Sequence, residues 1–140
     1  MGNTSYYLLQ TDNNYVQHLL VTVLSIQKHT PADRKNVFYI INDRIAEETI
    51  AFMDTFAKRF SLELRYLDMS DKVSLFEERG IPKWHGGYTA YMKLFAMSKI
   101  EDAERVLYLD SDIIVREDLT PVFAELDDTD APIAMANANP

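Results

Sequence analysis

The residues from Arg105 to Val115 read RVLYLDSDIIV, two apolar runs separated by Asp110, Ser111 and Asp112. Apolar runs too short for a helix are typical of strands buried in a sheet. Alternate side chains of an extended chain point the same way, so the two carboxylates can share one cation. A surface Asp-x-Asp turn is the alternative. The flanking apolar runs favour a buried strand whose polar groups need a partner, and we expect the second run to continue extended.

Strand and helix patterns alternate through the rest of the chain. Short apolar or alternating runs predict strands at residues 5–10, 37–41, 62–67 and 105–109. Helical spacing predicts helices from residue 16 to the stop at 29–31, at 46–60 and at 88–99, with a short helix around 72–79 inside a long loop. This order predicts an α/β fold with a mostly parallel sheet between helices. Ligands of such sheets gather at the carboxyl ends of the strands.

Composition limits the partners and the chemistry. The chain has 140 residues, 47% of them hydrophobic, which is enough for one core and one domain over residues 1–140. Lys and Arg number 14 against 22 Asp and Glu, and a net charge of −8 disfavours binding to nucleic acid. Without cysteine, any metal is held by oxygen or imidazole, which favours a hard cation.

The two ends of the chain carry further expectations. No apolar run reaches the roughly 18 residues of a membrane span, and the start lacks the pattern of a signal peptide. We therefore expect a soluble, cytoplasmic protein, or one peripheral to a membrane within a longer chain. Residues 133–136 predict another strand with no element after it, as in a domain truncated at its C-terminus. The exposed sheet edge would then favour self-association or pairing with a partner.

Three stretches carry a resemblance to a known family. They are QTDNNY at 10–15 followed by a helix, YMKL at 91–94, and VLYLDSDIIV at 106–115. In sequence, order and spacing they resemble glycosyltransferase family 8, which includes the glycogenins and bacterial lipopolysaccharide galactosyl- and glucosyltransferases. The resemblance covers nearly all of residues 5–137. It implies the GT-A form of the nucleotide-binding α/β fold, with three α/β/α layers, and a retaining hexosyltransferase.

The resemblance implies a metal site at the acidic triplet. Asp110 and Asp112 would bind a Mn²⁺, or a Mg²⁺, that bridges the two phosphates of a UDP-sugar, with Asp110 and Ser111 also near the nucleoside. Charge arguments agree, because breaking the sugar–phosphate bond loads negative charge onto the leaving diphosphate, and a divalent cation neutralises it.

The family pattern also implies a nucleoside site at the end of the first strand. Thr11, Asp12 and Asn14 would contact uridine and ribose, and Tyr15 would stack on the uracil ring. Alternatives remain at this point. Asp12 and Asn14 also suit a turn or a helix N-cap, and Tyr15 suits a staple packed on the core at the entry to the helix.

Weaker assignments follow from the same resemblance. Lys93 would lie near the donor phosphates and sugar, where a solvated helix residue is the alternative. Asn137 would line the donor sugar site, and His85 would lie on the acceptor side unless it is a surface residue. Trp84 is either a platform for a sugar or an anchor for its loop, and we expect the anchor.

Departures from the family define what the sequence leaves open. We expect the third metal ligand of relatives, a His, and the basic residue that grips the diphosphate to come from a region that this sequence does not reach. His18 and His29 are not expected to substitute, because both lie in the first predicted helix. We expect this chain alone to bind donor but to transfer poorly. The choice of glucose or galactose stays open, as does a saccharide, lipid-linked or protein acceptor.

Other classes are the remaining alternatives. An Asp-x-Asp phosphatase would place its motif after the first strand, and a nucleotidyltransferase would open with a Gly-rich basic loop that is missing after Leu9. A nucleotide-sugar-binding fragment or inactive relative without catalysis is the stronger competitor.

Overall fold

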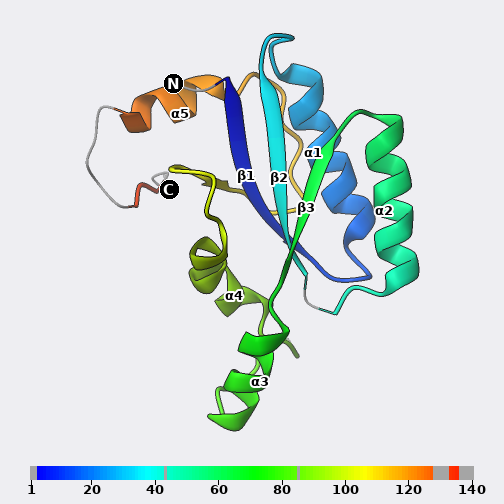
Figure 1. Ribbon diagram of the computed structural model, residues 1–140, viewed down its shortest axis with the longest axis vertical. Coiled ribbons are helices and arrows are strands. Elements are labelled where there is room, and N and C mark those ends of the chain that lie inside the picture. The colour runs from blue at the N-terminus through cyan, green and yellow to red at the C-terminus, as the bar shows by residue number, and fades with distance from the viewer. Residues whose placement is uncertain (1–2, 43, 85, 128–132, 136–140) are drawn as a thin grey trace.

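The computed structural model describes residues 3–42, 44–84, 86–127 and 133–135 (Figure 1). The strands are β1 (Thr4–Thr11), β2 (Lys35–Asn42), β3 (Glu63–Asp68) and β4 (Leu107–Tyr108). The helices are α1 (Val16–His29), α2 (Glu47–Arg59), α3 (Ser70–Glu78), α4 (Thr89–Ala96) and α5 (Thr120–Asp127), with the 3-10 turn η1 (Met97–Lys99) after α4. In this part of the chain no helix has the length and apolar character needed to span a bilayer.

The sheet is parallel, in the order β3-β2-β1-β4. The chain runs outward from β1 to β3 and then returns to the other side of β1. Where the connections from two neighbouring parallel strands run to opposite sides, the sheet has a topological switch point, and a ligand crevice opens there at the carboxyl ends of the strands. Here that point lies between the ends of β1 and β4.

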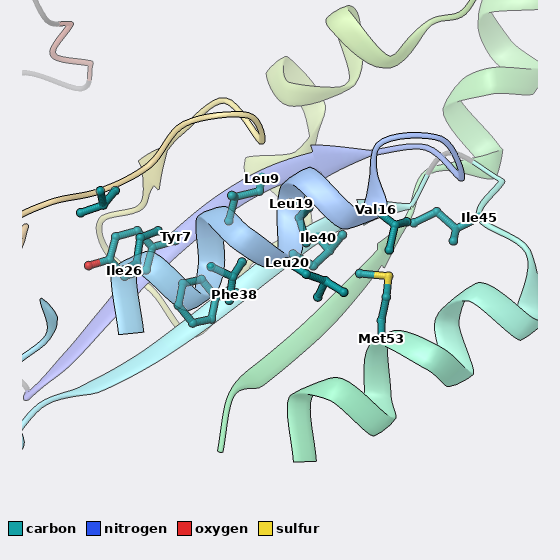
Figure 2. Close-up of a cluster of buried hydrophobic side chains, with 12 residues drawn as sticks. Tyr7, Leu9, Val16, Leu19, Leu20, Ile26, Phe38, Ile40, Ile45 and Met53 are labelled. Carbon is teal, nitrogen blue, oxygen red and sulfur yellow. The ribbon is translucent and has the colours of Figure 1, made fainter. Parts of the chain in front are cut away.

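Helices α1 and α2 cover one face of the sheet (Figure 1). Figure 2 shows Leu19 and Leu20 of α1 among side chains of β1 and β2, including Leu9 and Ile40. Leu19, Leu9 and Ile40 are fully buried. Each such side chain contributes roughly 1.5–3 kcal/mol by leaving water, so the helical spacing of α1 fixes this helix to the sheet.

Helix α4 packs on the opposite face, and α3 extends from the carboxyl end of β3 and adds side chains to the same cluster (Figure 1). Phe76 of α3 and Met92 of α4 pack with Leu8 and Ile41 from the two central strands. Right-handed crossovers explain the two layers of helix, because the return from β3 to β4 runs opposite to the steps from β1 to β3. The predicted α/β class with a parallel sheet between two helical layers is confirmed.

The end of the described chain departs from the sequence-based prediction. Of the strand expected at 105–109, only Leu107 and Tyr108 form β4, although the backbone N–H of Leu109 also donates to the carbonyl of Leu8 in β1. Residues 113–115 continue outside the sheet. Helix α5 was not predicted. The strand expected at 133–136 is wrong over 133–135, which belong to no strand, and residue 136 lies outside the described residues.

Candidate functional site

A cavity of about 620 Å³ opens at the switch point, between the carboxyl ends of the strands and the loop before α4. It is lined by Gln10, Asp12, Tyr15, Arg44, Trp84, Gly86, Gly87, Ala90, Asp110, Ser111 and Asp112. The structure thus brings together the two polar strand ends that the sequence placed at one edge. The lining includes three aspartates and one arginine, a balance that suits a bound cation.

Ser111 fastens the acidic turn to the neighbouring strand. Its side chain is only 7% exposed, and its hydroxyl donates a hydrogen bond to the carbonyl of Gln10 in β1. Asp110 and Asp112, on either side of it, are exposed and line the cavity. One buried hydroxyl therefore holds the turn, while the flanking carboxylates are exposed in the cavity.

Helix α1 holds the segment that follows the turn. The hydroxyl of Thr22 donates to the carbonyl of Ile113 at 2.7 Å, and the backbone N–H of Val115 donates to the hydroxyl of Ser25 at 2.9 Å. These bonds replace sheet hydrogen bonds, which explains why the predicted strand ends early. The acidic turn is thereby tied to both β1 and α1.

Few protein groups neutralise the two carboxylates. The hydroxyl of Tyr108 lies 3.4 Å from an oxygen of Asp110, and burial, followed by the charge of Asp110, raises the pKa of Tyr108 to about 12. For Asp112, the described residues provide neither a hydrogen bond nor an ion pair. Also within those residues, no group of three or more His, Asp or Glu side chains could hold a metal. A cation here would take the remainder of its ligands from substrate and water.

The ligand chemistry of this turn fits a divalent cation. Carboxylate oxygens are the ligands that Mn²⁺ and Mg²⁺ prefer. The amide oxygen of Gln10, a residue of the same lining, is buried without a hydrogen-bond partner in the described chain. The two exposed carboxylates of the turn therefore carry the fit to a hard cation.

The turn after β1 is built around Asp12. Its Oδ1 accepts hydrogen bonds from the backbone N–H groups of Asn14 at 2.8 Å and Tyr15 at 3.0 Å, so the turn interpretation of Asp12 holds. Asp12 also lines the cavity, whereas Thr11 is buried and Asn14 is exposed outside the lining. A turn role and a ligand role are compatible for a carboxylate at this position.

Tyr15 does not pack on the core. Its side chain is 49% exposed, its ring lies 4.9 Å from that of His18, and it lines the cavity. The staple alternative is therefore wrong, and the exposed ring is available to a ligand.

Trp84 lies in the loop before α4. Its backbone exchanges two hydrogen bonds with Gly87, at 2.9 and 3.1 Å, and Gly86 provides the left-handed backbone, φ +82°, in this turn. The indole is 63% exposed and lines the cavity. The indole is therefore not buried in the core, and the role of Trp84 as an anchor or as a sugar platform stays a prediction.

The other predicted site residues either do not line the cavity or lie outside the residues that the structure describes. The Nζ of Lys93 lies 4.9 Å from the ring centre of Tyr108, whose hydroxyl contacts Asp110, and Lys93 is not part of the cavity lining. His85 and Asn137 lie outside the described residues.

Gln10 and Arg44 were missed as site residues. Both lie where a central strand ends, Gln10 in β1 and Arg44 two residues after β2. The rule that ligands gather at the carboxyl ends of strands applies equally to β2 and could have found Arg44.

Comparison with known proteins gives a family match over most of the chain. The model of Glycosyl transferase family 8 matches residues 7–138. Two relatives from Streptococcus pneumoniae are similar: glycosyltransferase GlyF is 34% identical over 83% of this chain, and glycosyltransferase GlyB is 31% identical over 89%. The aligned part is 27% of GlyF and 30% of GlyB, so the chain spans less than a third of each.

Solved structures share the fold. The galactosyltransferase LgtC, solved with donor and acceptor sugar analogues, superposes with a TM-score of 0.66 at 26% identity, over 84% of this chain and 41% of that one. The bifunctional glycosyltransferase WbbM gives 0.69 at 16% identity, over 89% of this chain and 21% of that one. The latter is a likeness of fold alone. These neighbours agree with the expected GT-A form of the sheet.

Proposed function

The chain belongs to glycosyltransferase family 8, and from this we propose that it forms the donor site of a retaining hexosyltransferase. The donor is a UDP-sugar bound with Mn²⁺ or Mg²⁺, and the acceptor is a saccharide, a lipid-linked sugar or a protein. The observation that carries the proposal is the cavity at the switch point, where Asp110 and Asp112 lie beside Asp12 and Tyr15. LgtC, 26% identical, was solved with sugar analogues of both substrates, which supports a donor site in this fold.

The acidic turn would hold the metal. Asp110 and Asp112 are exposed on a turn fixed by Ser111, so their oxygens need little rearrangement to bind a cation. When bound, Mn²⁺ or Mg²⁺ would neutralise charge that develops on the departing diphosphate. Without a cation, the two carboxylates would repel the diphosphate, which makes metal dependence a direct consequence of this lining.

The turn after β1 would hold the nucleoside. The exposed ring of Tyr15 offers a face for the uracil, and the free carboxylate oxygen of Asp12 can accept hydrogen bonds from ribose hydroxyls or the base. Thr11 and Asn14 would then act mainly through the backbone of this turn. Lys93, over the ring of Tyr108, would add positive charge near the phosphates.

The loop before α4 would contact the hexose. Trp84 lines the cavity with Gly86 and Gly87, and an exposed indole suits the apolar face of a pyranose ring. His85, in the same loop, stays a proposed acceptor residue on the resemblance alone. The site would thus run from nucleoside at β1 to sugar at the α4 loop.

Calorimetry on the chain tests the proposal. UDP should bind in Mn²⁺ and lose most of its affinity in EDTA. Asp112→Asn keeps the size of the side chain and removes its charge. Altering groups that merely support a metal ligand typically costs 10–100-fold, so we expect this variant to lose at least about tenfold in Mn²⁺-dependent UDP affinity.

A matched variant guards against a general charge effect. Asp33→Asn removes the same charge from an exposed turn before β2, at the opposite end of the strands. It should bind UDP like the parent. Equal UDP affinity in the parent and in Asp112→Asn would show that the metal assignment is wrong.

Binding without transfer is the second candidate. It is favoured by the finding that the described residues contain no cluster of three metal-binding side chains. Measuring hexose transfer and UDP-sugar hydrolysis on one sample separates the two. Turnover in either assay supports catalysis, and tight UDP binding with neither activity supports a binding role.

A further inference from the structure

Arg44 occupies an unusual place beside the candidate site. It lies two residues after β2, is exposed, and lines both the main cavity and a second cavity of about 240 Å³ bounded by Asn42, Asp68 and Ser70. It therefore forms part of the wall between the two. In the described lining of either cavity it is the only basic residue.

The backbone at Arg44 is left-handed, with φ +56°. L-residues rarely adopt this conformation, which glycine tolerates without cost. Ser61, after α2, is the other non-glycine residue at positive φ in the described chain, and it lines neither cavity. Strained residues concentrate where a side chain is needed for function, so a strained arginine in a cavity wall points to a ligand contact.

Hydrogen bonds hold this turn against the turn that carries Asp12 and Tyr15. The side chain of Asn42 accepts a hydrogen bond from the backbone N–H of Ile45 at 2.9 Å. The backbone N–H of Ala46 donates to the side chain of Asn13 at 2.9 Å. The β2 turn is thus tied to the β1 turn, and Arg44 is placed at the nucleoside end of the cavity.

The strand order gives the direction of the donor. Because β1 lies between β2 and β4, the Tyr15 turn lies between Arg44 and the acidic turn. If the diphosphate binds at Asp110 and Asp112 and the base at Tyr15, the group nearest Arg44 is the edge of the base. A guanidinium has only hydrogen-bond donors and stays charged at every working pH.

We propose that Arg44 selects the base of the donor nucleotide, by donating a hydrogen bond to a carbonyl oxygen of the pyrimidine. Uracil carries a carbonyl oxygen at the position where cytosine carries an amino group. A site with only donors favours the first and opposes the second, since two donors facing each other leave both unpaired. This inference rests on the proposed function and adds a residue for base specificity to it.

The test compares UDP and CDP in Mn²⁺ by calorimetry, for the parent and for Arg44→Gly. Glycine removes the guanidinium and tolerates the left-handed backbone of residue 44, so this variant is expected to fold, which its melting curve checks. We expect UDP affinity to fall about tenfold and CDP affinity to change little, so that the preference for UDP shrinks. Ser61→Gly relieves the other left-handed residue and should leave both affinities unchanged.

The outcomes separate the inference from its premise. A parent that binds neither nucleotide in Mn²⁺ contradicts the proposed function and the inference with it. A parent that binds UDP, with an unchanged ratio of UDP to CDP affinity in Arg44→Gly, overturns the inference alone. An equal loss of affinity for UDP and CDP in Arg44→Gly also overturns the inference, because it means that the arginine attracts the phosphates that both nucleotides share.

Discussion

Tyr15 leaves the core for the cavity, and one substitution tests its role. Replacing Tyr15 by Ala should weaken UDP binding in Mn²⁺ by roughly 1–3 kcal/mol, the range measured for a base stacked on an aromatic side chain. The melting temperature of the Tyr15→Ala variant should stay near that of the parent, because the ring of Tyr15 is half exposed in the parent. Tyr15→Phe keeps the face of the ring and should retain most of the affinity. Unchanged UDP binding in Tyr15→Ala would exclude stacking.

Trp84 can be tested in the same way on the sugar. Trp84→Ala should weaken binding of a UDP-hexose by about 0.5–1.5 kcal/mol, the scale of aromatic packing, and leave UDP itself unaffected. Trp84→Phe should recover part of the loss. Titrating both ligands against each variant isolates the hexose contribution. A loss of the same size for UDP would place the indole against the nucleotide instead.

At the scale of single residues, the sequence correctly predicted that side chains in a motif at a strand end line the site. Asp110, Asp112, Asp12 and Tyr15 meet in one cavity because parallel strands bring their carboxyl ends together. Arg44 was missed because neither the composition nor the spacing of its turn carries a motif. The exposure of Trp84 was not predicted either, because a single aromatic residue in a loop carries no local pattern that reports its burial.

At the scale of elements, periodicity identified most helices and strands but not where β4 ends. The run 113–115 is as apolar as a strand, yet its backbone is held by Thr22 and Ser25 of α1. Side chains from a distant helix decide this, and no local pattern reports them. Helix α5 did leave a local signal, since Asp118 caps its start by accepting hydrogen bonds from the N–H and hydroxyl of Thr120 at 2.9 and 2.7 Å.

A polar clamp joins the segment before β4 to the two neighbouring strands of the sheet. Asp102 accepts hydrogen bonds from Tyr39 of β2 and Arg65 of β3, and these bonds, that of Tyr39 first, lower the pKa of the Asp102 carboxyl. The segment that leads into the acidic turn is thereby held to the sheet.

This clamp predicts a pH dependence with a definite sign. A carboxylate whose pKa is lower in the folded state contributes stability that is fully present above its ordinary pKa of about 3.9. That contribution is lost as the pH falls through the lower folded value. Asp102→Asn should therefore be less stable than the parent at pH 7, and the difference should narrow in strong acid. Urea midpoints at both pH values, with Asp33→Asn as the control for charge, measure it. If the difference in urea midpoint between the parent and Asp102→Asn were the same at both pH values, the proposed role of the Asp102 hydrogen bonds would be contradicted.

For the molecule as a whole, the strand order could not be predicted from the sequence. Alternating patterns indicated a parallel sheet between helices, but periodicity does not say which strands pair. The order β3-β2-β1-β4 requires the chain to return across two strands after β3, which the long segment before β4 makes possible. That return creates the switch point, so the site depends on a topology that only the structure displays.

Net charge and site together predict how the whole molecule responds to its ligands. A ligand that binds only the folded state at 100 times its Kd stabilises it by about 2.7 kcal/mol. For a domain of this size, that corresponds to a rise in Tm of roughly 9 °C. UDP alone should give almost no rise, because a chain of charge −8 with three aspartates in the cavity repels the diphosphate. Mn²⁺ alone should give a small one.

Together the two should act synergistically, because each supplies what the other lacks: the diphosphate completes the ligands of the cation, and the cation cancels the repulsion. Thermal melts with UDP, Mn²⁺, both, and both in excess EDTA measure this directly and need no acceptor or turnover. Asp112→Asn should lose the synergy and Asp33→Asn should keep it. If UDP in EDTA raised Tm as far as UDP in Mn²⁺, the nucleotide would bind elsewhere on the chain, because at the acidic turn its diphosphate requires the cation.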